Sequence, residues 1–177
     1  EEFQEINELV VDGIIGGSTK KMLYSDDAKE YTHEPDDQSS SMNVTGNITK
    51  KTNLNPEKLE EVLPSALKGL GEALYNGEQQ YDINSLFVLS IINYESGNGT
   101  SNLAQNQNNL GGIKAQAGYR TFSSKAECVE YMYDLLGSKY IGRGLTTIPE
   151  IGEVYCPGGT WATNVTENMQ DLIAECN

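Results

Sequence analysis

An apolar stretch that ends in a glutamate is the feature that most constrains how this chain can fold. Residues 86–92 are apolar apart from Ser90, and Glu95 follows shortly before Gly97. A helix that is apolar on nearly every side belongs in the centre of a domain. A carboxylate half-buried at its end has its charged form disfavoured, so its pKa rises and it can hold a proton near neutral pH. The pattern predicts a buried central helix that carries a general acid beside a polar loop.

A simpler interpretation is that Glu95 only closes the helix. A carboxylate at a helix C-terminus opposes the helix dipole, which makes that position unfavourable without another role. We therefore favour the catalytic interpretation.

Composition limits the classes of partner. The chain has 177 residues, enough for one ordinary domain with an extension or for two very small domains. Its 26 acidic and 12 basic residues give a net charge of −14, which argues against a nucleic-acid partner because phosphate contacts need a Lys/Arg stripe. No apolar run is long enough to span a membrane. The cysteines match no zinc pattern, so we expect no metal and no cofactor.

The chain divides by composition into two parts. Residues 1–52 are poor in hydrophobic side chains and rich in clustered acids, so we expect an acidic N-terminal arm or linker. Residues 53–177 show helical periodicity and are expected to form the folded domain.

The first helix of that domain is expected to begin at Pro56, with a kink near Pro64 and an end at Asn76-Gly77. Asn84 is a plausible N-cap for the central helix, and Gly97 a plausible stop.

Three further helices follow in the second half. Ser124 and Glu127 fit a capping box for a helix that ends at Gly137. A brief helix is expected over residues 148–154, and an amphipathic helix from Trp161 onward. The result is a small, mainly α domain with little room for a sheet.

Several segments, taken together, resemble glycoside hydrolase family 73, the endo-β-N-acetylglucosaminidases of the lysozyme-like superfamily. Residues 94–101 read Tyr-Glu-Ser-Gly-Asn-Gly-Thr-Ser, and residues 108–114 read Asn-Asn-Leu-Gly-Gly-Ile-Lys. Residues 119–124 and 151–157, together with Trp161, complete the resemblance, which spans roughly residues 67–177. It implies a small lysozyme-like helical domain that acts as a glycoside hydrolase.

The resemblance also implies site residues. Glu95 matches the catalytic acid, which protonates the β-1,4 glycosidic oxygen between N-acetylglucosamine and N-acetylmuramic acid in peptidoglycan, and Tyr155 matches a catalytic-site tyrosine. The substrate-binding candidates come from the glutamate loop, the cleft-lining segment and the Tyr-Arg-x-Phe piece: Ser96, Asn98, Ser101, Asn109, Gly112, Ile113, Lys114 and Tyr119.

Two departures from the family pattern concern the second half of the site. Gly111 stands where the family usually has an aromatic residue, and only residues 115–118 replace a β-lobe that often carries a second carboxylate. Little or no β-lobe is therefore expected. Glu153 is the best remaining candidate for a second acid. The alternative is substrate assistance, in which the sugar's own 2-acetamido group attacks the anomeric carbon.

The function expected is hydrolysis of peptidoglycan glycan strands. A lytic transglycosylase on the same polymer and a non-catalytic cell-wall-binding module are the alternatives. The expected location is extracellular or on a phage virion, as a tail lysin or a bacterial autolysin that acts on the cell wall. Residues 1–52 are then expected to contact other virion or cell-wall assembly proteins.

Overall fold

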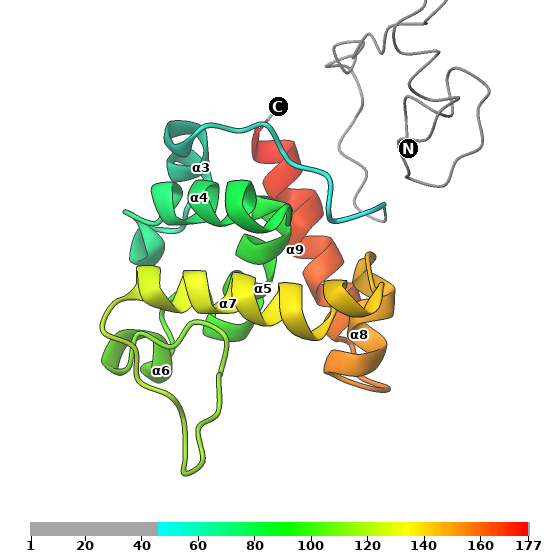
Figure 1. Ribbon diagram of the computed structural model, residues 1–177. Helices are drawn as coiled ribbons and strands as arrows, with labels where there is room; N and C mark the ends of the chain where they lie inside the picture. Colours follow the sequence, from blue (N-terminus) through cyan, green and yellow to red (C-terminus); the bar gives the residue numbers. More distant parts are fainter. Residues whose placement is uncertain (1–45, 177) are drawn as a thin grey trace, which may run out of the picture. The chain divides into compact units, whose positions relative to one another are not determined.

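The computed structural model describes residues 46–176, which fold into a mainly helical domain (Figure 1). The elements are, in chain order, α3 (Pro56–Val62), η1 (Ser65–Leu67), α4 (Gly71–Tyr81), α5 (Ser85–Ser96), α6 (Asn102–Asn106), α7 (Lys125–Lys139), η2 (Ile141–Arg143), α8 (Ile148–Tyr155) and α9 (Trp161–Cys176). None of these helices combines the length and apolar character that a membrane crossing needs. The expected arm over residues 1–52 falls mostly outside the described part of the chain.

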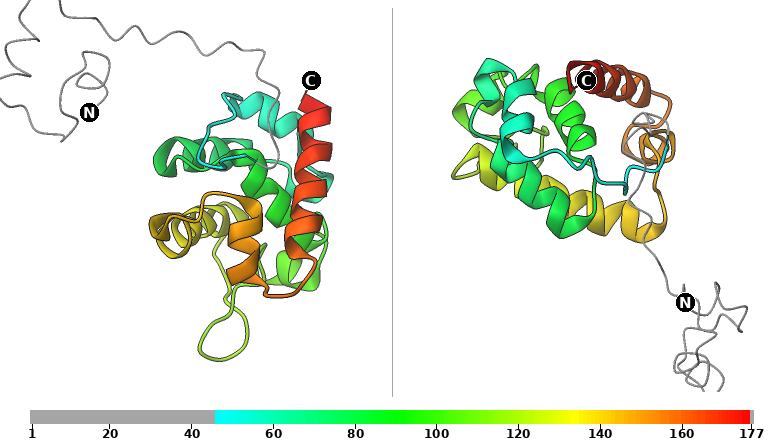
Figure 2. Two further views of the ribbon diagram at one scale, coloured as in Figure 1. Left: turned by 90° about the vertical axis from the view of Figure 1, so that its right-hand side faces the viewer. Right: turned by 90° about the horizontal axis from the view of Figure 1, so that it is seen from above.

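Helix α5 is the central element, as predicted. Ten of its twelve residues are buried, and its N-cap Asn84 accepts a hydrogen bond from the Phe87 amide. Gly97 ends the helix in the left-handed conformation, with φ of 57°. Helix α9 packs along α5, while α4 packs against α3 and α7 (Figures 1 and 2). The C-terminal end of α5 meets the start of α9, where Trp161 donates a hydrogen bond to Glu95.

The segment before α3 is tied to the domain. Ile48 is buried, donates its amide to the Thr146 carbonyl and accepts from the Asn84 amide. Thr52 donates its amide to Glu78 Oε1 at 2.8 Å and its hydroxyl to Glu78 Oε2 at 2.9 Å. We therefore propose that the folded domain begins before residue 52.

The expected first helix is broken rather than kinked. Helix α3 ends at Val62, a 3-10 turn follows Pro64, and α4 begins at Gly71. The expected end at Asn76-Gly77 is wrong, because α4 continues through both residues to Tyr81. Gly77 has a packing role there: a Cβ at this position would overlap the ring of Tyr133.

The remaining helices lie close to their predicted ranges. Ser124 caps α7 by accepting from the Glu127 amide, and the Glu127 carboxylate accepts from the amide and hydroxyl of Ser123, with a smaller contribution from the Ser124 backbone. A capping box does form at α8, between Thr147 and Glu150. Helix α7 continues to Lys139, past the expected end at Gly137.

A tight hairpin occupies the place of the missing β-lobe. Lys114 and Tyr119 form an isolated antiparallel bridge, and the Arg120 amide donates to the Ile113 carbonyl at 2.8 Å. No regular strand occurs within residues 46–176. The prediction of little or no β-lobe is confirmed; Figure 1 shows the hairpin as the loop between α6 and α7.

Replacing Gly77 by alanine should lower the free energy of unfolding by about 1–3 kcal/mol, because the added methyl collides with a fixed ring. The Tyr133 ring is buried and its hydroxyl donates to the Leu74 carbonyl at 2.8 Å, so it cannot move aside. The matched control is Gly137→Ala in α7, whose Cβ would lie 3.6 Å from Tyr81. That change should stabilise by up to about 1 kcal/mol. Urea unfolding measures both; a Gly77→Ala variant as stable as the parent would contradict the packing account.

Candidate active site

Glu95 lies in the last turn of α5 and is partly exposed. Its Oε1 accepts a hydrogen bond from the indole Nε1 of Trp161, the first residue of α9, at 3.0 Å. Neither described ion pair involves Glu95, so no arginine or lysine of residues 46–176 bridges to it and holds it ionised.

Tyr155 completes the immediate surroundings of the carboxylate. Its ring stacks on Trp161 with the centroids 4.5 Å apart, and its hydroxyl hydrogen-bonds with Glu95. Tyr140 also packs against Tyr155, at a centroid distance of 6.0 Å. The ends of α5 and α8 and the start of α9 thus bring Glu95 and Tyr155 together, although 60 positions separate them in the sequence.

The electrostatics favour a protonated acid. Burial raises the pKa of Glu95 above its ordinary value, and the hydrogen bonds from Trp161 and Tyr155 oppose this rise without cancelling it. Burial and the nearby charge of Glu95 raise the pKa of the Tyr155 hydroxyl far above its usual range. Tyr155 therefore keeps its proton and acts as the donor in the pair.

The loop before the hairpin approaches Glu95 from a third side. Gly112 has φ of 60°, and a Cβ built on it would lie 3.9 Å from Glu95 Oε2. Ile113 is half-buried, whereas Lys114 and Tyr119 are exposed, with 47% of Tyr119 accessible. Among the predicted substrate-binding residues, those from Gly112 onward therefore lie beside the acid or extend away from it along the hairpin.

Two polar candidates, Asn109 and Ser96, have their side chains engaged with backbone groups. Asn109 is 1% exposed and bonds to the backbone of Ile113 and Arg120, which holds the hairpin closed. Ser96 donates to the Ile92 carbonyl and accepts from the Gly99 amide.

The remaining two candidates lie in the same loop. Ser101 caps α6 by accepting from the Ala104 amide. Asn98 is exposed, in the left-handed conformation at φ of 57°. Both shape the turn that follows the acid.

No second carboxylate contributes to the pKa shift of Glu95, whose causes are burial, Trp161 and Tyr155. Glu153 is exposed on α8, two positions before Tyr155. Side chains two positions apart on a helix do not share a face. Glu127 and Glu150 are engaged in helix-start contacts, and hydrogen bonds lower the pKa of each.

Two hydrogen-bonding interactions at the ends of α5 were not predicted from the sequence. Trp161 begins the predicted amphipathic helix and is 2% exposed, as a core residue would be, yet its indole N–H donates to the Glu95 carboxylate. The available signal was that a buried tryptophan N–H needs an acceptor. Glu78 is fully buried and accepts from Thr52 and from the Ser85 amide at the N-terminus of α5. Nothing in the sequence around Glu78 indicates that this glutamate is buried.

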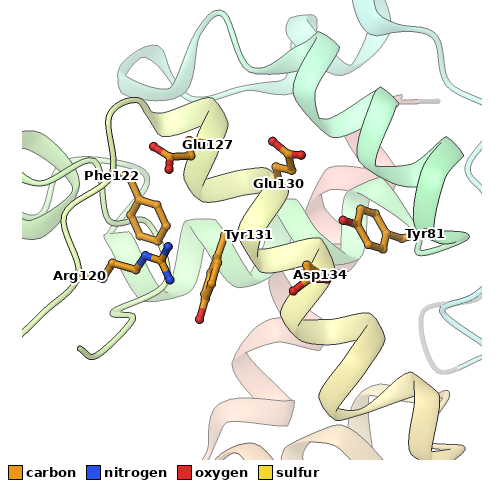
Figure 3. A pocket seen from close by; sticks show the side chains of 7 residues that line it. All are labelled: Tyr81, Arg120, Phe122, Glu127, Glu130, Tyr131 and Asp134. Carbon is orange, nitrogen blue, oxygen red and sulfur yellow. The ribbon is translucent and has the colours of Figure 1, made fainter. Parts of the chain in front are cut away.

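A cavity of about 290 Å³ lies elsewhere, on the outer side of α7 (Figure 3). Its lining residues are Tyr81, Arg120, Phe122, Glu127, Glu130, Tyr131 and Asp134. None of the predicted site residues lines it.

A partly buried glutamic acid with a raised pKa, held by a tyrosine and a tryptophan in a small helical domain, has the chemistry of the general acid of a glycoside hydrolase. The comparisons agree. The family profile described as Glucosaminidase, mannosyl-glycoprotein endo-beta-N-acetylglucosaminidase, matches residues 71–172. The chain belongs to this glucosaminidase family, and is a glycoside hydrolase of the endo-β-N-acetylglucosaminidase type. The resemblance to glycoside hydrolase family 73 is confirmed.

Solved structures share the fold. Autolysin E of S. aureus in complex with muropeptide NAM-L-ALA-D-iGLU matches with a TM-score of 0.62 and 18% identity, covering 75% of this chain and 72% of that chain. A catalytic mutant of the same autolysin in complex with disaccharide NAG-NAM gives a TM-score of 0.59 at 18% identity, with 76% and 72% covered. The Major Bifunctional Autolysin gives 0.59 at 19%, with 76% and 68% covered. No curated protein sequence matches the chain.

Replacing Trp161 by phenylalanine should raise the pKa of Glu95 further, because it removes a donor that stabilises the charged carboxylate while a ring remains against Tyr155. Carboxyl-carbon NMR titration measures the shift. Tyr140→Phe is the control: Tyr140 packs on Tyr155 but does not contribute to the pKa of Glu95. An unchanged or lower pKa in Trp161→Phe would contradict the assignment of the indole as a donor to the acid.

Proposed function

We propose that the chain hydrolyses the β-1,4 bond between N-acetylglucosamine and N-acetylmuramic acid in peptidoglycan, with Glu95 as the general acid. The main support for this role is the raised pKa of Glu95, together with its contacts to Trp161 and Tyr155. Peptidoglycan is favoured over a mannosyl-glycoprotein because structures of the same fold were solved with a muropeptide and with NAG-NAM.

The proposed mechanism needs one carboxyl group. Glu95 gives its proton to the glycosidic oxygen, the bond from C1 to that oxygen breaks, and the oxygen leaves with the electron pair as the 4-hydroxyl of N-acetylmuramic acid. The carbonyl oxygen of the 2-acetamido group bonds to C1 at the same time. This bond closes a five-membered oxazolinium ring on the sugar. Water then attacks C1, the bond from C1 to the acetamido oxygen breaks, and one proton of the water passes to the Glu95 carboxylate.

The surroundings of Glu95 support this single-acid route. Glu153 projects from another side of α8 than Tyr155, and Glu127 and Glu150 are engaged by serine and threonine groups. The hairpin at residues 113–120 is too short to hold a lobe with an additional acid. The substrate's own acetamido group supplies the nucleophile that these residues do not.

Tyr155 is proposed to act as a positioning residue in the resting enzyme and to stabilise charge later. Its hydroxyl keeps its proton and bonds to Glu95, so it orients the carboxyl group. When Glu95 has given up its proton, the same hydroxyl donates to the new carboxylate, which lowers the energy of the charged intermediate.

Glu95→Gln should lower the release of reducing ends from purified cell walls by about 10²–10⁴-fold, because the amide cannot donate a proton. Glu153→Gln is the matched variant, an exposed glutamate on α8, and should keep most of the activity. Colorimetric counting of reducing ends measures both.

Three results would contradict the proposal. Near-total loss of activity in Glu153→Gln would show that a second acid is required. If the parent chain binds cell walls without turnover, and Glu95→Gln binds them equally well, the chain is a non-catalytic binding module. Products with 1,6-anhydro ends, seen by mass spectrometry, would instead identify a lytic transglycosylase.

Substrate assistance predicts that removing the acetyl groups of N-acetylglucosamine abolishes hydrolysis, because a free amine has no carbonyl oxygen to attack C1. Chemically de-N-acetylated glycan strands test this, and re-acetylation of the same strands should restore turnover. Hydrolysis of the de-acetylated strands at the parental rate would show that a protein nucleophile operates.

The proposed substrate places the enzyme outside the cell, at the bacterial wall. The part of the predicted arm at residues 1–45 lies outside the described residues, so its contacts with virion or wall assembly proteins remain a prediction. The wall carries anionic polymers, and a chain with net charge −14 gains no long-range attraction to it. Attachment through another protein would overcome that repulsion.

A further inference from the structure

The cavity on α7 combines charges of both signs with aromatic walls. Arg120 reaches it from the hairpin, Tyr81 closes the opposite end, and α7 forms the floor with Glu130, Tyr131 and Asp134 (Figure 3). Its volume of about 290 Å³ is at the lower end of small-ligand sites, the size of a few amino-acid residues rather than of a glycan chain.

The positive end of the cavity is held in place by aromatic rings, and its nearest described counter-charge is Glu127, whose pKa it helps to lower. The Arg120 guanidinium carbon lies 4.3 Å from the centroid of the Tyr131 ring and 5.1 Å from that of Phe122. A guanidinium stacked on rings keeps its N–H donors in its own plane, where they can take a carboxylate in a two-pronged contact. The direct ion pairs that the described residues form involve Lys51 and Lys58, so Arg120 forms no direct ion pair there and its N–H donors can take a further carboxylate.

The negative end likewise forms no direct ion pair within the described residues. Glu130 and Asp134 lie one helical turn apart on α7, where like charges repel. No described lysine or arginine pairs with either carboxylate, whereas Glu127 is engaged by Ser123. The free carboxylates of the cavity are therefore suited to an ammonium group.

The cavity is connected to the acid through the hairpin. The Arg120 amide bonds to the Ile113 carbonyl, and Gly112, the preceding residue, approaches Glu95 Oε2. The hairpin therefore contributes both to the cavity, through Arg120, and to the surroundings of the acid, through Gly112.

We propose that this cavity binds the stem peptide of peptidoglycan, with Arg120 on a carboxylate, Glu130 and Asp134 on the ammonium group of the diamino acid, and Tyr131 and Tyr81 against its methylene groups. The proposal rests on the proposed function for its choice of peptide. It assigns the peptide-reading residues to α7 and the hairpin, apart from the glycan-cleaving residues at α5, α8 and α9.

The test is direct binding of the peptide N-acetyl-L-Ala-γ-D-Glu-L-Lys, which contains no glycosidic bond, measured by titration calorimetry. Arg120→Gln should weaken binding about tenfold, the effect of losing one charge-assisted hydrogen bond. The double change Glu130→Gln with Asp134→Asn, both at exposed positions, should weaken it at least as much. A peptide with its carboxylates amidated and its lysine acetylated should not bind.

The matched control is Glu167→Gln with Asp171→Asn, an exposed acidic pair at the same spacing on α9, which should bind like the parent. Absence of binding to the parent chain would overturn the proposal. Equal weakening by the control pair would also overturn it, because attraction to the overall negative charge would then explain the binding. Calorimetry needs no turnover, so failure here is distinguishable from failure of glycan hydrolysis, which is scored by reducing ends.

Discussion

Burial of α5 is the constraint on which the rest of the structure depends. Ten of the twelve residues of the helix are buried, and α9 and α4 pack against it, so whatever lies at its ends is drawn into partly dry surroundings. A charged carboxylate in such surroundings costs free energy unless donors compensate it. At Glu95 the donors are only Trp161 and Tyr155, and burial remains the larger effect.

The opposite end of the same helix shows what full compensation looks like. Glu78 is completely buried, but it accepts from the Thr52 amide and hydroxyl and from the Ser85 amide in the first turn of α5. The helix dipole also favours a negative charge at that end and disfavours one near Glu95. The N-terminal end of α5 thus meets a structural carboxylate from α4 where the dipole helps, and its C-terminal end carries an acid suited to proton donation where the dipole hinders.

The sequence predicted the parts of the fold that depend on local chemistry. The apolar run, the Asn84 cap and the Gly97 stop define α5 without reference to any other segment. Gly77 shows the limit: after an asparagine it has the pattern of a turn, but it lies mid-helix because Tyr133, far along the chain, occupies the space of a side chain. Such contacts are made between distant segments and leave no local pattern.

In the candidate site, too, features set by local sequence could be predicted, whereas contacts between distant segments could not. Glu95 could be predicted from its position at the end of an apolar helix, whereas its bond to Trp161 depends on how α9 packs on α5. The polar loop residues suited ligand binding by type, yet Asn109 and Ser96 bond to backbone groups instead. Side-chain type alone does not distinguish a residue that holds a loop from one that faces a ligand.

The central claim is that burial keeps the proton on Glu95 at the pH where the enzyme works. Its most direct test is the pH dependence of kcat/KM on soluble glycan strands, which reports the pKa of the acid in the free enzyme. The account predicts that activity falls on the alkaline side with a pKa above the ordinary value of a glutamate. A fall whose midpoint lies at or below the ordinary glutamate pKa would show that burial does not hold the proton on Glu95 and would contradict the account.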